Sequence, residues 1–182
     1  SRLTSGSGAE EEATFSPDGK LVAFVRANNL HVVDLAGRER TITTDGGREI
    51  LNGKLDWLYQ EEIYGRGRFR GYWWSPDSSR LAFLQLDERP VPEYTVVDDL
   101  PYRPTVEVTD YPKAGDPNPL VKLGIIDATG GAVRWVPLSD LGYTAVKSWD
   151  ILRDVIYEHD FVKIFIMQYG IGNVLPFCIL LL

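Results

Sequence analysis

The chain has 182 residues, 44% of them hydrophobic and 25% charged, a composition typical of a globular protein rather than a disordered one. Acidic residues outnumber basic ones by 26 to 19, which gives a net charge of −7 and argues against a nucleic-acid partner, because phosphate binding needs clustered cations. The single cysteine, Cys178, excludes an internal disulfide and a cysteine-rich zinc site. With only two histidines, His31 and His159, we expect no metal site.

The N-terminal residues show none of the features of a native start or a secretory leader. They lack an initiator methionine, a basic segment and an apolar segment. We therefore expect the chain to begin inside a longer protein or after processing.

Residues 15–24 and 74–83 form an internal repeat. They read FSPDGKLVAF and WSPDSSRLAF, identical at five of ten positions with an offset of 59 residues. Ser-Pro-Asp-Gly suits a type I turn, because serine caps the first position and proline presets φ at the second. Each copy therefore predicts a strand, a tight turn and a second strand.

A second pair of similar segments extends the repeat. LHVVD at 30–34 and LGIID at 123–127 are separated by 93 residues, and each precedes a glycine-containing turn and a further strand, at 38–44 and 132–138. Each unit then has four short antiparallel strands, the size and pattern of a β-propeller blade. A β-sandwich or a meander is the alternative. We predict an all-β fold with about two blades, too few to close a propeller, which needs about four to eight.

The first segment that departs from the repeat, residues 45–71, connects the two units. Apolar residues at helical spacing predict a short helix that ends before Gly65, with two adjacent acids, Glu61 and Glu62, near its end. Neighbours on an ideal helix point about 100° apart, but a terminal or strained turn could aim both carboxylates at one ammonium group, which has three donors. A solvated acidic helix face is the alternative. Three alternating arginines follow and either pair with these acids or lie along a solvated edge strand: Arg66, Arg68 and Arg70.

The second departure, residues 85–121, lies inside the second unit and contains six prolines, which argue against a central strand or a helix. An extended arm or a hairpin fits this composition best. Tyr94, Tyr102 and Tyr111 give it amphipathic contact area. Such an arm is either functional or a brace for a neighbouring blade.

Four motifs follow one another in order: DWLYQEEIYGR (56–66), GYWWSPDSSRLAFLQLDE (71–88), EY (93–94) and YPKAGDPNP (111–119). On these motifs, residues 15–143 resemble the N-terminal β-propeller of the dipeptidyl peptidase IV branch of the prolyl oligopeptidase family, in its bacterial form. The resemblance implies a propeller that caps an α/β-hydrolase domain of the same parent protein. It also implies a cofactor-free serine exopeptidase that releases Xaa-Pro or Xaa-Ala dipeptides from peptide N-termini.

In that family a double glutamate binds the free α-amine of the substrate, so the resemblance implies that Glu61 and Glu62 bind peptide N-termini. An amine held at a fixed distance from the nucleophile would select the peptide bond two residues from the N-terminus. A non-enzymatic propeller that serves as a scaffold for protein partners is the alternative. By analogy the parent would be periplasmic or secreted.

The proline-rich arm resembles the segment with which the family reaches a partner subunit. We therefore expect a homodimer contact there, made by Tyr94, Tyr102, Tyr111 and Lys113. A membrane partner is not expected.

We expect no catalytic residue in this chain, because it has no Gly-x-Ser-x-Gly motif and neither histidine lies near a nucleophile motif. The resemblance ends near Tyr143, which divides the chain into a propeller fragment, 1–143, and a divergent apolar tail, 144–182. Three explanations of the tail stay open: a shifted reading frame, a divergent third blade, or a membrane segment within residues 161–182.

Overall fold

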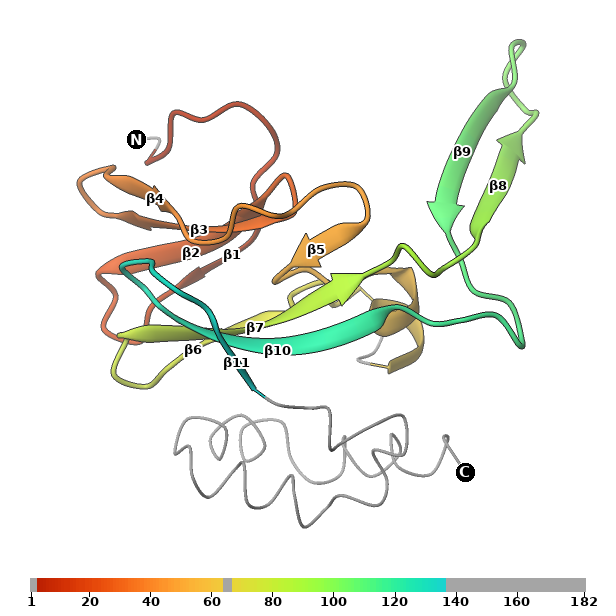
Figure 1. The fold of residues 1–182 in the computed structure, drawn as a ribbon. Helices are drawn as coiled ribbons and strands as arrows, with labels where there is room; N and C mark the ends of the chain where they lie inside the picture. Colours follow the sequence, from red (N-terminus) through yellow and green to blue (C-terminus); the bar gives the residue numbers. More distant parts are fainter. Residues whose placement is uncertain (1–2, 64–66, 137–182) are drawn as a thin grey trace.

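The computed structural model describes residues 3–63 and 67–136, which form strands β1 to β11 and one short helix, η1 (Figure 1). The first four strands make one antiparallel sheet in the order β1-β2-β3-β4. This sheet is the first predicted blade. Its strands are β1 (Glu11–Phe15), β2 (Leu21–Arg26), β3 (Asn29–Asp34) and β4 (Glu39–Thr41).

The second sheet is built around the long strand β7, which pairs along its whole length with β10. β11 pairs with the far side of β10, and β6 pairs with the first half of β7, so these four strands form the second predicted blade. A further strand, β5, pairs with the second half of β7. The sequence did not indicate β5. The strands are β5 (Ile50–Asn52), β6 (Tyr72–Trp74), β7 (Arg80–Asp87), β10 (Leu120–Asp127) and β11 (Arg134–Val136).

Both Ser-Pro-Asp turns have the same hydrogen bonds, which confirms the predicted turn chemistry. In each, the serine hydroxyl donates to the turn aspartate, over 2.7 Å from Ser16 and 2.6 Å from Ser75. The fourth turn residue has a positive φ, 73° at Gly19 and 62° at Ser78. At this strained position the Ser78 side chain makes a hydrogen bond that glycine could not make. Its hydroxyl accepts the backbone N–H of Asp18 at 3.1 Å. The two turns are thus hydrogen-bonded to each other across the blades.

The main hydrophobic core lies between the two sheets. Its largest buried side chain, Tyr72, extends from β6 to the backbone of the first sheet. The Tyr72 hydroxyl lies 2.8 Å from the Ala23 carbonyl oxygen and also contacts the Glu12 carbonyl, where β1 bulges. Burial raises the pKa of Tyr72 to about 12, so the phenol remains a donor. The apolar core residues are Ala23, Val25, Leu30, Val32, Ile42, Tyr72, Leu81, Phe83 and Ile126.

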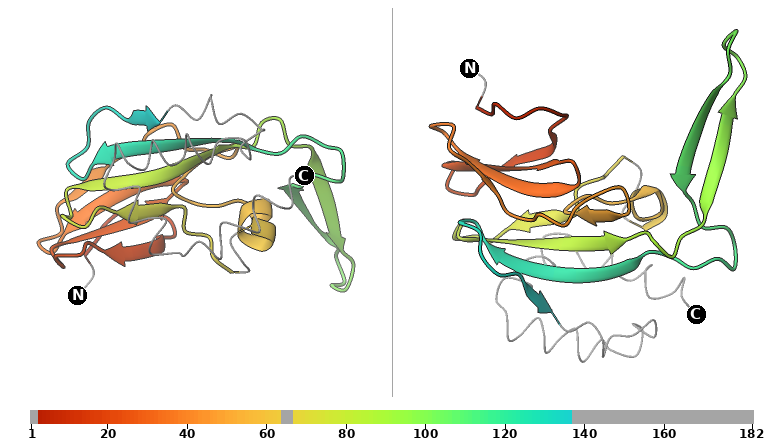
Figure 2. Two further views of the ribbon diagram at one scale, coloured as in Figure 1. Left: turned by 90° about the horizontal axis from the view of Figure 1, so that it is seen from below. Right: turned by 45° about the horizontal axis from the view of Figure 1, so that its top comes forward.

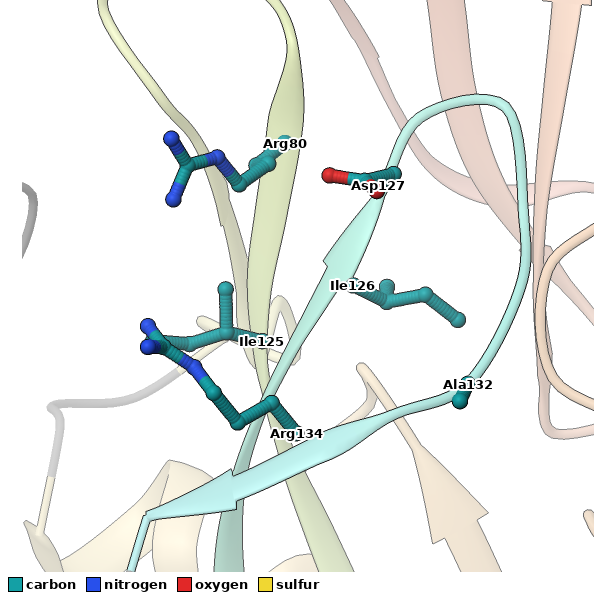
Figure 3. A pocket seen from close by; sticks show the side chains of 6 residues that line it. All are labelled: Arg80, Ile125, Ile126, Asp127, Ala132 and Arg134. Atoms are coloured by element: carbon teal, nitrogen blue, oxygen red, sulfur yellow. The ribbon is translucent and has the colours of Figure 1, made fainter.

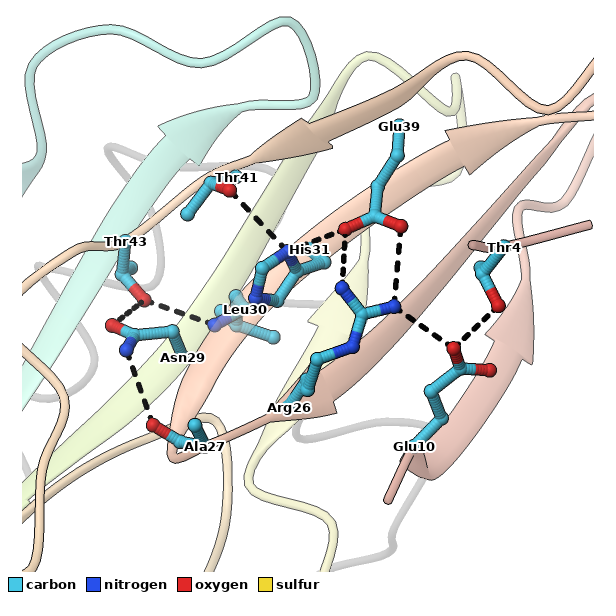
Figure 4. A network of polar contacts seen from close by, with 10 residues as sticks. All are labelled: Thr4, Glu10, Arg26, Ala27, Asn29, Leu30, His31, Glu39, Thr41 and Thr43. Carbon is cyan, nitrogen blue, oxygen red and sulfur yellow. Dashed lines mark hydrogen bonds and ion pairs between the residues drawn. The ribbon is translucent and has the colours of Figure 1, made fainter. Parts of the chain in front are cut away.

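A polar network covers the other face of the first sheet (Figure 4). The Arg26 guanidinium lies between Glu39, at 2.6 Å, and Glu10, at 2.8 Å, and so ties the N-terminal segment to β4. His31 is buried in β3, where its ring stacks on Phe24 at 5.2 Å. Burial lowers the pKa of His31, and its Nδ1 lies 3.1 Å from the Glu39 carboxylate and 3.4 Å from the Thr41 hydroxyl. His159 and Cys178 lie outside the described part of the chain.

The predicted arm is a two-stranded hairpin of β8 (Glu93–Asp98) and β9 (Thr105–Asp110) that projects from the end of the second sheet (Figures 1 and 2). All of β8 is exposed. Across residues 3–63 and 67–136, no helix is long and apolar enough to cross a membrane. The predicted tail, 144–182, lies outside these ranges.

Candidate functional site

The predicted acidic helix is present and starts from a buried aspartate. Helix η1 (Tyr59–Ile63) continues a turn that begins at Trp57. The Asp56 carboxylate accepts the backbone N–H of Tyr59 at 2.9 Å, and the Asp56 carbonyl accepts that of Gln60 at 3.1 Å. Asp56 is therefore the N-cap, which satisfies backbone donors that the first helical turn leaves without partners.

Helix η1 is a π-helix, and this helix type was not predicted. Its hydrogen bonds span five residues instead of four, so each turn is wider than in an α-helix. Successive residues are therefore separated by less than the about 100° of an α-helix. Glu61 and Glu62 are consecutive residues of η1, and Glu61 is half-buried.

Packing on both sides holds the helix in place. Leu55, just before the cap, is buried against Leu51 of β5 and Leu86 of β7. The buried Gln60 side chain accepts the backbone N–H of Gly67 at 2.9 Å, which closes the loop after the helix. Of the three alternating arginines, Arg66 lies outside the described residues, Arg68 is exposed, and Arg70 makes a backbone bridge to Lys54.

The base of the arm packs against this helix. The Trp57 ring lies 4.6 Å from that of Tyr111, which in turn lies 5.7 Å from that of Tyr94. The Lys113 ammonium lies 4.7 Å above the Tyr94 ring. Three of the four predicted contact residues thus gather at the arm's base, whereas Tyr102 is at the tip and 100% exposed. Figures 1 and 2 show the helix and the hairpin at the same end of the second sheet.

A second buried acid, Glu88, lies at the end of β7 and was not predicted from the sequence. Burial and the nearby charges of Asp56 and Asp110 raise the pKa of Glu88 to about 8. Burial also raises the pKa of Asp56. In the sequence, Glu88 stands in a charged run, Asp-Glu-Arg, which gives no sign of burial.

Other candidate sites are distant or absent in the described chain. Within it, no group of three or more His, Cys, Asp or Glu side chains is arranged to hold a metal ion. A shallow cavity of about 260 Å³ lies at the Arg80 end of β7, the opposite end from Glu88 (Figure 3). It is therefore separate from helix η1. Its lining residues are Arg80, Ile125, Ile126, Asp127, Ala132 and Arg134.

Comparison with known proteins places the chain in one family. The family described as dipeptidyl peptidase IV (DPP IV) N-terminal region matches residues 1–157. The probable dipeptidyl-aminopeptidase B of Emericella nidulans is 33% identical over 88% of this chain and 20% of that protein. The probable dipeptidyl peptidase 4 of the same organism is 41% identical over 69% of this chain and 17% of that protein.

A solved structure gives the same result. The crystal structure of Porphyromonas gingivalis dipeptidyl peptidase 4 matches 75% of this chain and 19% of that one, with a TM-score of 0.67 and 37% sequence identity. The chain spans about a fifth of the length of these proteins. The family match passes the boundary predicted at residue 143, which stays a prediction. The two sheets are two blades of the propeller, and the chain belongs to the dipeptidyl peptidase IV N-terminal region family.

Proposed function

We propose that Glu61 and Glu62 bind the free α-amine of a peptide, and that this chain is the substrate-recognition part of a dipeptidyl peptidase that releases Xaa-Pro or Xaa-Ala dipeptides. The observation that supports this most directly is the π-helix, which holds the two acids in one wide turn. The buried cap at Asp56 and the packing of Leu55 keep that turn rigid.

The chemistry of an ammonium group fits two neighbouring carboxylates. It has three N–H donors and no acceptor, and charge-assisted hydrogen bonds are worth about 1.5–3 kcal/mol each. An amine fixed in this way sets the distance to the scissile bond. The nucleophile and its base would come from the hydrolase domain of the parent protein, since relatives named as dipeptidyl peptidases are about five times longer.

The residues that match Glu61 and Glu62 in the P. gingivalis enzyme provide the test. Each is replaced singly by glutamine, and kcat/KM is measured with a Xaa-Pro substrate and with its analogue that lacks the amino group. We expect at least about a tenfold loss for the amine substrate, because 1.4 kcal/mol is a factor of ten. The analogue is the matched control and should be cleaved equally by wild type and variants. Unchanged cleavage of the amine substrate would exclude the anchor role.

We also infer that the β8–β9 hairpin contacts a second copy of the chain. Its apolar side chains are exposed on a projecting hairpin, which soluble proteins seldom leave uncovered. We expect light scattering to show a dimer for the full chain and a monomer for Val97→Lys, with Leu35→Lys, at an exposed residue of the turn between β3 and β4, as control. A monomeric wild type would contradict the inference. The exposed apolar residues are Tyr94, Val96, Val97, Leu100, Tyr102, Val106 and Val108.

A further inference from the structure

The Glu88 backbone is hydrogen-bonded to two segments of the chain, and the helix start packs against β7 two residues before it. The Glu88 backbone N–H donates to the carbonyl of Glu49, before β5, and the Glu88 carbonyl accepts the N–H of Val91, which leads into the arm, both at 2.8 Å. The helix start packs here too, through Leu55 against Leu86. The returning end of the arm packs near here too, since the Tyr111 ring contacts the Trp57 ring. We call this region around Glu88 the joint. Glu88 is only 8% exposed at this joint.

The charged groups that face Glu88 are mostly negative. They come from the helix start (Asp56), from the end of β9 (Asp110) and from the segment before β5 (Arg48 and Glu49). Arg48 is paired with other acids, with Glu93 at 2.5 Å and with Asp110 at 3.6 Å. Among the residues that the structure describes, no hydrogen bond or ion pair reaches the Glu88 carboxyl. Burial and the neighbouring acids raise the pKa of Glu88 to about 8, so its carboxyl is mostly protonated at neutral pH.

Asp56 and Glu88 differ in the donors available to them. Asp56 accepts the Tyr59 backbone N–H, which stabilises its charged form. Glu88 has no such donor. When two neighbouring carboxyls interact, the one with donors keeps the charge and the other keeps the proton.

We propose that Glu88 is a positioning residue for Glu61 and Glu62, a role that rests on the amine binding proposed for these two glutamates. As a neutral acid it lets Asp56 carry the charge that caps helix η1. Once ionised, it adds a second buried negative charge beside that cap. The repulsion destabilises the helix. Glu61 and Glu62 are then no longer held in position to bind the amine.

The titration of Glu88 and its effect on helix η1 can be followed directly in the full chain. Because the pKa of Glu88 is raised to about 8, we expect its side-chain carboxyl carbon to titrate near that pH by NMR. The amide signals of Tyr59 and Gln60 should shift with the same midpoint. In Glu88→Gln, a neutral mimic of the acid, this shift should be absent, whereas Glu49→Gln should keep it. A carboxyl signal that titrates near the ordinary 4.5, or an identical helix transition in Glu88→Gln, would overturn the proposal.

A second variant tests the same claim without altering Glu88. Asp56→Asn keeps a capping side chain but removes the negative charge beside Glu88. The titration of the Glu88 carboxyl carbon should then move to lower pH. If the titration of Glu88 does not move, the charges of Asp56 and Glu88 do not interact. That result would contradict the positioning role.

Binding of a Xaa-Pro dipeptide amide links the joint to the anchor. The probe's own amine loses its proton between pH 6.5 and pH 9, but this affects every variant equally. The ratio of Kd values, wild type over Glu88→Gln, should therefore be close to 1 at pH 6.5 and rise to about 10 at pH 9, if the ionised form does not bind. A ratio of 1 at both pH values would overturn the positioning role. If neither protein binds the probe at any pH, the anchor function itself fails, and the NMR titrations alone decide the role of Glu88 in holding the helix.

Discussion

Glu88 makes the stability of the folded chain depend on pH. Its pKa in the folded protein is about 8, against an ordinary 4.5, because burial and neighbouring acids favour the protonated form. Between these values the unfolded chain releases the proton and the folded chain keeps it, so stability falls as pH rises through this window. The contribution is complete below about pH 4.5 and lost above about pH 8.

Glu88→Gln should remove that dependence. We predict that the Tm of this variant, relative to wild type, rises from pH 4 to pH 9, because glutamine has no proton to lose. Thermal unfolding at the two pH values measures the difference. A Tm difference that does not change with pH would contradict the prediction.

Among the structural elements, the two Ser-Pro-Asp turns make the stability of the fold depend on pH in the direction opposite to that of Glu88. Hydrogen bonds from the Ser16 and Ser75 hydroxyls lower the pKa of Asp18 and of Asp77 to about 2. Their contribution is present above the ordinary value of 3.8 and is lost as pH falls towards 2. We predict that Asp77→Asn is less stable than wild type at pH 5 and that the difference vanishes near pH 2. Acid titrations of the Tm check this, and a constant difference would refute it.

The contact between the two sheets is tested at Tyr72. Tyr72→Phe keeps the ring but leaves the Ala23 and Glu12 carbonyl oxygens without this donor. We expect a loss of roughly 1–3 kcal/mol in the free energy of unfolding, the cost of leaving a buried polar group unsatisfied. Urea denaturation measures it. Tyr102→Phe, at a fully exposed tyrosine, is the control and should leave stability unchanged.

Local chemistry explains which elements the sequence could predict. The blade turns and the hairpin follow from turn residues and proline content, which act within a few positions of the chain. Strand β5 has only three residues, Ile50–Asn52, and exists because it pairs with β7 more than 30 residues later. The π-helical form of η1 and the burial of Glu88 depend likewise on packing between distant segments. The site residues Glu61 and Glu62 were found through a resemblance, since an adjacent acidic pair alone is also typical of a solvated helix.

At the scale of the whole molecule, the second blade is apolar on both faces. One face packs on the first blade, and the other carries a smaller buried cluster of Ala82, Ile125 and Val136. This two-sided burial is what a blade inside a propeller requires, and it agrees with a chain that spans about a fifth of its relatives. Helix η1 and the arm share one end of this blade (Figure 2), so substrate recognition and subunit contact would be neighbours in the parent protein.

Recognition of a free amine by this chain is the central claim, and the full chain can be tested directly. Its backbone NMR signals are followed during titration with a Xaa-Pro dipeptide amide and with the same compound N-acetylated. We predict saturable shifts at Glu61 and Glu62 with the free amine only, which Glu61→Gln and Glu62→Gln weaken. Equal shifts with the acetylated compound, or none at the helix with either, would contradict the account.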